Sequence, residues 1–275
     1  MRSVFSGLLT VIAMVCVIVA IPTMWVNERV VSADGFAASA EDAARNSEVQ
    51  QFFANKVGSS VADSTSVPLA GDIVEPLARN YARSDAFVAD FRDIARQQHA
   101  WLFTEPGPDT DLHVMDVNIT PMANRVIASA NLPQQVRLDR PVYIGIDQHR
   151  LSAGSLESTG NIVRSVAWIA TIGAVITALL ALLIANRRSV VLIWLGVGIV
   201  LAGIASYAVA LLIRTVAGDK TAGSDEAARR TVEVVADGVS ADLVQWAAVS
   251  GAVGAVVVVA GLLVRMVSRR PDPAY

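Results

Sequence analysis

The chain has 275 residues, of which 53% are hydrophobic and only 17% are charged, and its formal net charge at pH 7 is −3. This composition is too apolar for an ordinary soluble domain. The acidic balance argues against a nucleic-acid-binding protein, which needs basic patches. The single cysteine, Cys16, excludes an intramolecular disulfide, a cysteine metal site and a redox pair.

Four uncharged apolar runs account for this composition. Each reaches the roughly 20 residues that an α-helix needs to cross a bilayer, and none contains Asp, Glu, Lys, Arg or His. We therefore predict a mainly α membrane protein with four transmembrane helices. The predicted spans are residues 3–26, 165–185, 189–213 and 243–264.

The first run is predicted to be an uncleaved signal anchor. Arg2 gives it a basic start, but the run exceeds the roughly 7–15 apolar residues of a cleaved signal, and no small-x-small site follows it. Trp25 is predicted to be a membrane-interface anchor, because amphipathic rings favour the headgroup level. We expect the helix to continue beyond Trp25 into the next domain with little or no flexible linker.

The basic residues predict the orientation. With the N-terminus in the cytoplasm, the inner segments carry six arginines and one acid, whereas residues 27–164 carry 12 basic and 18 acidic residues and residues 214–242 carry 4 and 6. This distribution follows the positive-inside rule. It predicts a multi-pass protein of the plasma membrane, with cytoplasmic termini, a cytoplasmic tail at 265–275, and extracytoplasmic segments at 27–164 and 214–242.

Residues 27–164 are predicted to form an α-rich extracytoplasmic domain. Apolar residues recur every three or four positions, which indicates helices. Ser47-x-x-Gln50 fits a capping box that opens one helix, and Ser84 fits the cap of another. The positions that define the helices include Phe36, Ala40, Ala43, Ala44, Val49, Phe52, Phe53, Val57, Val61, Ile73, Leu77, Tyr81, Phe87, Phe91, Ile94, Ala95 and Trp101.

A small β element is predicted later in the same domain. Residues 112–117 alternate and residues 141–146 are rich in strand-forming side chains, and a short helix is expected between them at 122–128. Two short strands are not stable alone, so we expect them to pair and to pack on the helices. In the segment 214–242, Ser224 is expected to cap an amphipathic helix that packs on the domain, lies at the membrane surface or acts as a lid.

The order of several residues resembles a group of uncharacterised actinobacterial integral membrane proteins. The residues that carry the resemblance are Trp25, Asn27, Asp34, Phe36, Val49, Val57, Ser84, Phe87, Phe91, His99 and Leu102. The resemblance implies a signal anchor, an extracytoplasmic domain and three C-terminal spans. It implies no activity, cofactor or catalytic residue.

The sequence offers little that would support catalysis. Neither a phosphate-binding loop nor a dinucleotide fingerprint occurs, and the spans hold no ionisable group of the kind that pumps use. Asp111, His113 and His149 would meet around a metal only if the two strands pair. We therefore expect no catalytic, cofactor or metal site, and a metal-dependent enzyme is the least favoured alternative.

Small residues at four-residue spacing mark two of the spans. They allow close approach of helices, either within the bundle or with a partner protein. The candidates for helix packing or partner contact are Gly198, Ala202, Ser206, Ala247, Gly251 and Ala255.

We accordingly expect a non-enzymatic accessory or scaffolding subunit of a larger cell-envelope or respiratory membrane complex. Its expected partners are other membrane proteins and the lipid bilayer, and not nucleic acid. An extracytoplasmic ligand- or lipid-binding protein that acts as a sensor is the alternative.

Overall fold

The structure is a computed structural model that describes residues 2–64, 70–108, 110–129, 140–147, 152–221 and 226–267. The chain forms two compact units. The first, here called the membrane unit, comprises residues 1–28, 161–216 and 239–275. The second, here called the mixed unit because it holds helices and strands, comprises residues 29–160 and 217–238.

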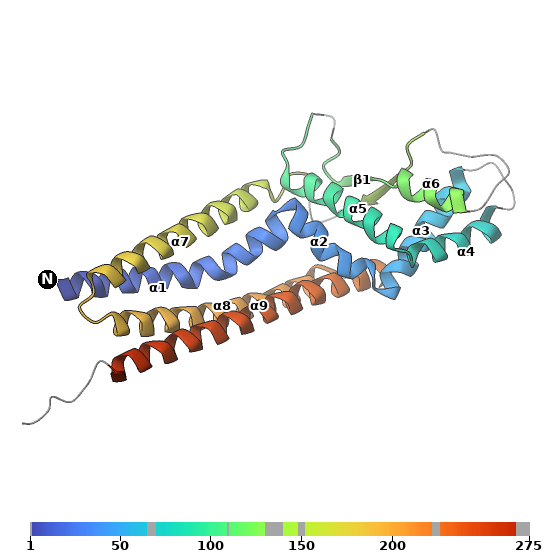
Figure 1. The fold of residues 1–275 in the computed structure, drawn as a ribbon. Helices are drawn as coiled ribbons and strands as arrows, with labels where there is room; N and C mark the ends of the chain where they lie inside the picture. Colours follow the sequence, from blue (N-terminus) through green and yellow to red (C-terminus); the bar gives the residue numbers. More distant parts are fainter. Residues whose placement is uncertain are drawn as a thin grey trace, which may run out of the picture. The chain divides into compact units, whose positions relative to one another are not determined.

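The membrane unit is built from long helices (Figure 1). They are α1 (Arg2–Val26), α7 (Glu157–Ile184), α8 (Arg188–Thr221) and α9 (Glu226–Val267), of which the first residues of α7 and α9 and the last residues of α8 belong to the mixed unit. The stretches long and apolar enough to cross a membrane are Arg2–Val31, Glu157–Ile184, Arg188–Ile213 and Ala236–Val267. Within the described residues, this confirms the prediction of a mostly helical protein with four candidate membrane-spanning helices.

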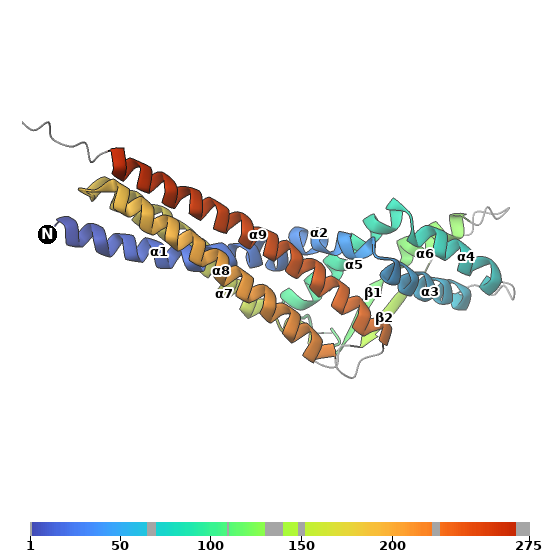
Figure 2. The ribbon, with the colours of Figure 1, turned by 90° about the horizontal axis from the view of Figure 1, so that it is seen from below.

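Neighbouring helices of the membrane unit pack through small side chains. Figures 1 and 2 both show α8 running beside α9. α1 packs on α7 and α8 through a buried apolar cluster that consists of Ala13, Ala181, Val191 and Leu195. Large apolar side chains point outward instead, and Ile169 and Leu183 are each 72% exposed. Such an outer surface is typical of helices that face lipid.

The segment 214–242 differs from its predicted form. α8 continues to Thr221, and α9 begins at Glu226 and reaches Val267 without interruption. The expected amphipathic helix is therefore the first part of α9. No proline interrupts this stretch, and a glycine such as Gly238 weakens a helix without ending it. The predicted cap, Ser224, lies outside the described residues.

The mixed unit combines short helices with a two-stranded antiparallel sheet, in which Val114 pairs with Asp147 and Asn118 with Tyr143. β1 (Val114–Asn118) precedes α6 (Thr120–Ser129) and β2 (Tyr143–Asp147) follows it, as the sequence predicted. The elements that have not yet been named are η1 (Asn27–Val31, a π-helix whose first two residues belong to the membrane unit), α2 (Ala33–Ala44), α3 (Ser47–Ser64), α4 (Ala70–Ala82) and α5 (Asp85–Phe103).

The helix starts agree with the sequence in one case and differ in another. The Ser84 hydroxyl accepts a hydrogen bond from the Phe87 amide and caps α5, as expected. At α3 the predicted capping box is wrong. The Asn46 side chain accepts from the Glu48 amide, and Gln50 donates its side-chain amide to the Ala44 carbonyl. Asn46 wins because asparagine caps a helix at least as well as serine.

The junction after the first span is helical only as far as Val31. η1 continues α1 as a π-helix, and Ser32 then adopts extended backbone angles, with φ −75° and ψ 128°. Its hydroxyl accepts from the Gly35 amide and caps α2. The expected continuous helix therefore ends at Ser32, because an N-cap residue leaves helical geometry.

The core of the mixed unit is aromatic and lies between its helices and one face of the sheet. Phe53 of α3 lies 5.0 Å from Phe91, measured between ring centroids. Met115 and Val117 of β1 point into the same core, whereas Asp116 between them is exposed. The alternation and the helical spacing seen in the sequence thus correspond to one buried cluster.

Gly154 is the one position in the described residues where the backbone itself demands glycine. Its φ is +70°, and a Cβ there would lie 2.7 Å from Pro106 Cδ and 3.1 Å from the Thr104 carbonyl oxygen. Gly154→Ala is expected to lower the free energy of unfolding by about 1–3 kcal/mol. Thermal unfolding of the full-length protein in detergent measures this. Gly107→Ala is the control, because its Cβ would meet Thr110 Oγ1 at 3.5 Å, an ordinary contact; equal losses would contradict the prediction.

Candidate functional site

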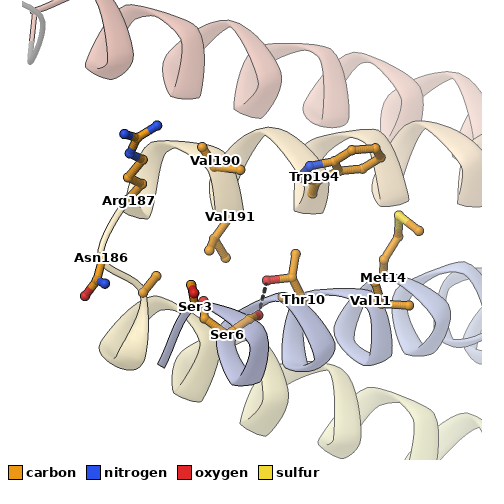
Figure 3. A pocket seen from close by; sticks show the side chains of 12 residues that line it. Ser3, Ser6, Thr10, Val11, Met14, Asn186, Arg187, Val190, Val191 and Trp194 are labelled. Carbon is orange, nitrogen blue, oxygen red and sulfur yellow. Dashed lines mark hydrogen bonds between the residues drawn. The ribbon is translucent and has the colours of Figure 1, made fainter. Parts of the chain in front are cut away.

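A groove lies in the membrane unit where α1 begins and where α7 turns into α8 (Figure 3). Its volume is about 690 Å³, within the range of about 300–1,000 Å³ that is usual for small-molecule sites. The residues of α1 that line it recur every three or four positions and therefore share one helix face. The lining residues are Ser3, Ser6, Gly7, Thr10, Val11, Met14, Ala185, Asn186, Arg187, Val190, Val191 and Trp194.

The groove is apolar along most of its length and polar at one end. Figure 3 shows Val191 pointing from α8 toward α1, with Met14 further along α1, while Asn186 and Arg187 lie at the α7–α8 turn. Thr10 Oγ1 donates to the Ser6 carbonyl at 2.7 Å, and Ser6 Oγ donates to the Ala181 carbonyl at 3.4 Å. Both buried hydroxyl protons are therefore satisfied within the protein.

A second feature of the membrane unit is the contact between α8 and α9, which is made through glycine backbones. A Cβ on Gly196 would lie 2.8 Å from the Gly254 carbonyl oxygen, and a Cβ on Gly254 would lie 2.8 Å from the Gly196 carbonyl oxygen. Gly203 faces the Ala247 carbonyl oxygen and Gly261 faces Ile193 in the same way. The glycines recur at seven residues on each helix, a spacing that keeps them on one face.

The six small residues singled out in the sequence do not form one surface. On α8, Ala202 and Ser206 are fully buried, and a Cβ on Gly198 would lie 2.8 Å from Met14 Cγ of α1. On α9, Ala247 is buried, whereas Ala255 is exposed. The backbone of Gly251 lies near Gly203, but a Cβ on Gly251 would meet nothing within 4 Å.

The side chain of Trp25 is buried in the protein, whereas a membrane-interface anchor was expected. Its side chain is only 4% exposed, and its indole N–H donates to Asp242 Oδ2 at 3.0 Å. A belt tryptophan would present its ring to lipid headgroups. Here Trp25 joins the end of α1 to α9, because a buried indole N–H needs an acceptor.

Asp90 is the centre of a buried polar network in the mixed unit. Its Oδ2 accepts from the Tyr81 hydroxyl at 2.6 Å and from Arg125 Nε at 2.7 Å, and its Oδ1 accepts from Arg125 Nη2 at 3.3 Å. The network joins α4, α5 and α6. Burial raises the pKa of Tyr81 above its ordinary value, and the hydrogen bond to Asp90 and its negative charge raise that pKa further. Such a group holds its proton and works as a donor.

The Tyr81–Asp90 bond predicts a specific pH dependence. Tyr81→Phe is expected to cost about 1–3 kcal/mol near neutral pH, because the buried carboxylate loses a donor. Above a pH of about 10, an unfolded tyrosine ionises while the folded Tyr81 stays protonated, so the wild type loses up to about 1.4 kcal/mol per pH unit through this group. The stability difference between wild type and variant should therefore shrink above pH 10. A difference that stays constant from pH 8 to pH 11 in thermal melts would contradict this.

His99 on α5 packs against the aromatic rings of Phe36 and Phe103. Its Nε2 lies 2.8 Å from the Val31 carbonyl oxygen, and its ring stacks on Phe103 at a centroid distance of 4.5 Å. Only 8% of its surface is exposed. This geometry fits a histidine that ties the last residue of η1 to α5, and it leaves little of the ring for a ligand.

The residues considered for a metal are only partly described. Asp111 Oδ1 accepts from the backbone amides of His113 and Val114 at 2.8 and 3.1 Å, and these hydrogen bonds lower the pKa of Asp111. The carboxylate thus closes a turn before β1. His149 lies outside the described residues. Among those described, no group of three His, Cys, Asp or Glu is placed to hold a metal ion.

The chain matches no protein-family model, no curated protein and no solved structure. The resemblance to actinobacterial membrane proteins therefore stays a prediction. The groove and the contact between the α8 and α9 glycines were not predicted from the sequence. The recurrence of glycine at 196 and 203 and at 254 and 261 was the available signal for the second.

Proposed function

We propose that this protein is a non-enzymatic accessory or scaffolding subunit of a larger cell-envelope or respiratory membrane complex. The observation that carries the proposal is the outer face of α9. Ala248, Ala252 and Ala255 lie at three- and four-residue spacing on it and are all exposed. A face of small side chains lets a partner helix approach closely.

The α8–α9 pair supports this interpretation from within the chain. There the same kind of small-residue face already brings two backbones together, through Gly196 and Gly254. The α9 glycines of that contact, Gly254 and Gly261, are buried, whereas the alanines of the outer face are exposed. Most of the exposed large apolar residues, by contrast, are Val, Leu and Ile, which suit contact with lipid chains.

The proposed setting is the plasma membrane, with both termini in the cytoplasm and residues 27–164 and 214–242 outside. The support for this orientation is the excess of arginine in the segments assigned to the inside. A mainly acidic outer domain would then be available to soluble or membrane-bound partners.

Site-specific photocrosslinking in the native membrane tests the proposal. A photoreactive residue at Ala255 should yield a discrete adduct with another membrane protein, which mass spectrometry identifies. The same residue at Ile169 of α7, which is 72% exposed, is the control and should give lipid adducts only. Gly251→Leu adds bulk beside the face without an internal clash and should reduce the Ala255 adduct. Identical adducts at both positions, or none at Ala255, would count against the proposal.

A further inference from the structure

We propose that the groove between α1 and α8 binds one anionic phospholipid, with a headgroup phosphate at Arg187 and an acyl chain along the apolar length. The inference concerns a different face of the membrane unit from the one in the proposed function. Lipid binding does not depend on that function, and only the assignment of the leaflet rests on the orientation proposed there. It rests on the shape of the groove, the state of its hydroxyls and its charge.

The first step is that the groove suits a hydrocarbon chain. Val11, Met14 and Val191 form much of its wall. Water would need two to four polar partners to stay there. The buried hydroxyl protons of Ser6 and Thr10 are already given to backbone carbonyls. The occupant therefore needs apolar surface along the helices and no donor or acceptor in the interior.

The second step is the charge at the polar end. Arg187 is the one charged side chain among the described residues that line the groove, and it is exposed there beside Asn186. A guanidinium presents a planar set of donors that fits a phosphate. Arg2 and Arg188 adjoin lining residues in the sequence and add positive potential. The Ser3 hydroxyl, also exposed, supplies another polar contact.

The third step is the position of the groove along the helices. It lies where α1 and α8 begin, so the polar end falls at one end of two candidate membrane spans. Trp194, 51% exposed, lies seven residues after Arg187, further along α8 toward the Met14 end, and extends the apolar wall (Figure 3). Basic pockets between transmembrane helices bind anionic headgroups in this way. In the proposed orientation this end faces the cytoplasmic leaflet, which in many membranes is rich in anionic lipids.

A partner helix is the competing occupant, and it fits less well. The first turns of the α1 wall are small (Ser3, Ser6, Gly7 and Thr10), but the large side chains of Val11, Met14 and Trp194 line the rest of the groove and hold a second helix backbone away from it. One end of the groove is at a turn that carries a positive charge, which suits a headgroup better than the continuing backbone of a helix.

Native mass spectrometry of the full-length protein tests the proposal, with micelles that contain equal amounts of phosphatidylglycerol and phosphatidylcholine with the same acyl chains. The wild type should retain one phosphatidylglycerol. Arg187→Gln should lower the preference for phosphatidylglycerol about fivefold, the ratio expected when one basic residue near the headgroup is lost. Arg188→Gln is the control, because Arg188 does not line the groove. An equal loss in both variants would show diffuse surface attraction and would overturn the site.

Gly7→Leu tests the acyl-chain part. Gly7 lines the groove, and a Cβ there would meet no atom within 4 Å, so leucine fills the space without a clash. Retention of both lipids should fall to background. Gly251→Leu places the same side chain in open space on α9 and should retain lipid as the wild type does.

Unchanged retention in Gly7→Leu would refute the proposal, as would a photocrosslink from Val11 to a protein instead of a lipid. Gly7→Leu should leave the Ala255 adduct intact, so the two proposals fail separately.

Discussion

Gly254→Leu is expected to break the contact between α8 and α9 and to be among the most damaging single substitutions in the membrane unit. A Cβ at this position would lie 2.8 Å from the Gly196 carbonyl oxygen and 2.8 Å from the Val200 amide nitrogen. Both atoms belong to the backbone, so no side-chain rotation relieves the clash. The helices must separate, and we expect a loss of about 3 kcal/mol or more, the upper end of overpacking costs.

The measurement is the thermal unfolding of the full-length protein in detergent, together with cysteine crosslinking between α8 and α9. Gly251→Leu is a matched control, since it adds the same side chain three residues earlier, where a Cβ meets nothing within 4 Å. It should unfold like the wild type and crosslink as efficiently. The close glycine contact is refuted if the two variants lose the same stability.

The helices of this protein were predictable because their signals are local. An uncharged run of about 20 residues, or apolar residues spaced three and four apart, lies entirely within the residues of one helix. The four candidate spans and the helices that hold Phe53, Phe87 and Phe91 were therefore predicted correctly as helices from the sequence. The capping box at Ser47 failed because Asn46, one residue earlier, takes the cap position and accepts from the Glu48 amide.

The faces of the membrane helices were not predictable in the same way. Gly198 and Gly196 are both small, but which of them meets α9 depends on how α8 is rotated in the bundle. A four-residue spacing pointed to Gly198, whereas Gly196 and Gly203 make the contact. The groove depends on where α7 turns into α8 and on the absence of a side chain at Gly7. The effect of both depends on how the helices pack, which no local sequence pattern shows.

The buried network could have been found in the sequence. Asp90 lies three residues after Phe87 and four before Ile94, on the apolar face of α5. A carboxylate on such a face needs a partner, because a buried unpaired charge is costly. The sequence did not show that the partners would be Tyr81 and Arg125, which come from two other helices.

Arg125→Leu is expected to destabilise the mixed unit by about 3 kcal/mol. Asp90 is 7% exposed and, of the two donors described above, would keep the Tyr81 hydroxyl alone, so its negative charge would be left largely uncompensated. Arg125 itself is 53% exposed, so water can reach part of the vacated site, which keeps the loss at the lower end for broken buried pairs. For a unit of this size the melting temperature should fall by on the order of 10 °C.

Two further variants distinguish the buried charge from loss of packing or of a surface arginine. Arg96→Leu on α5 removes an arginine whose partners Asp34 and Asp93 are 86% and 68% exposed, so it should leave the melting temperature unchanged. The triple variant Tyr81→Phe, Asp90→Leu and Arg125→Leu replaces the whole network with apolar groups and should recover most of the stability lost by Arg125→Leu, because no buried charge remains to be compensated. Melts of the full-length protein in detergent at neutral pH make the comparison. A triple variant less stable than Arg125→Leu would mean that the network acts through its shape and hydrogen bonds, and that the uncompensated charge is not the main cost.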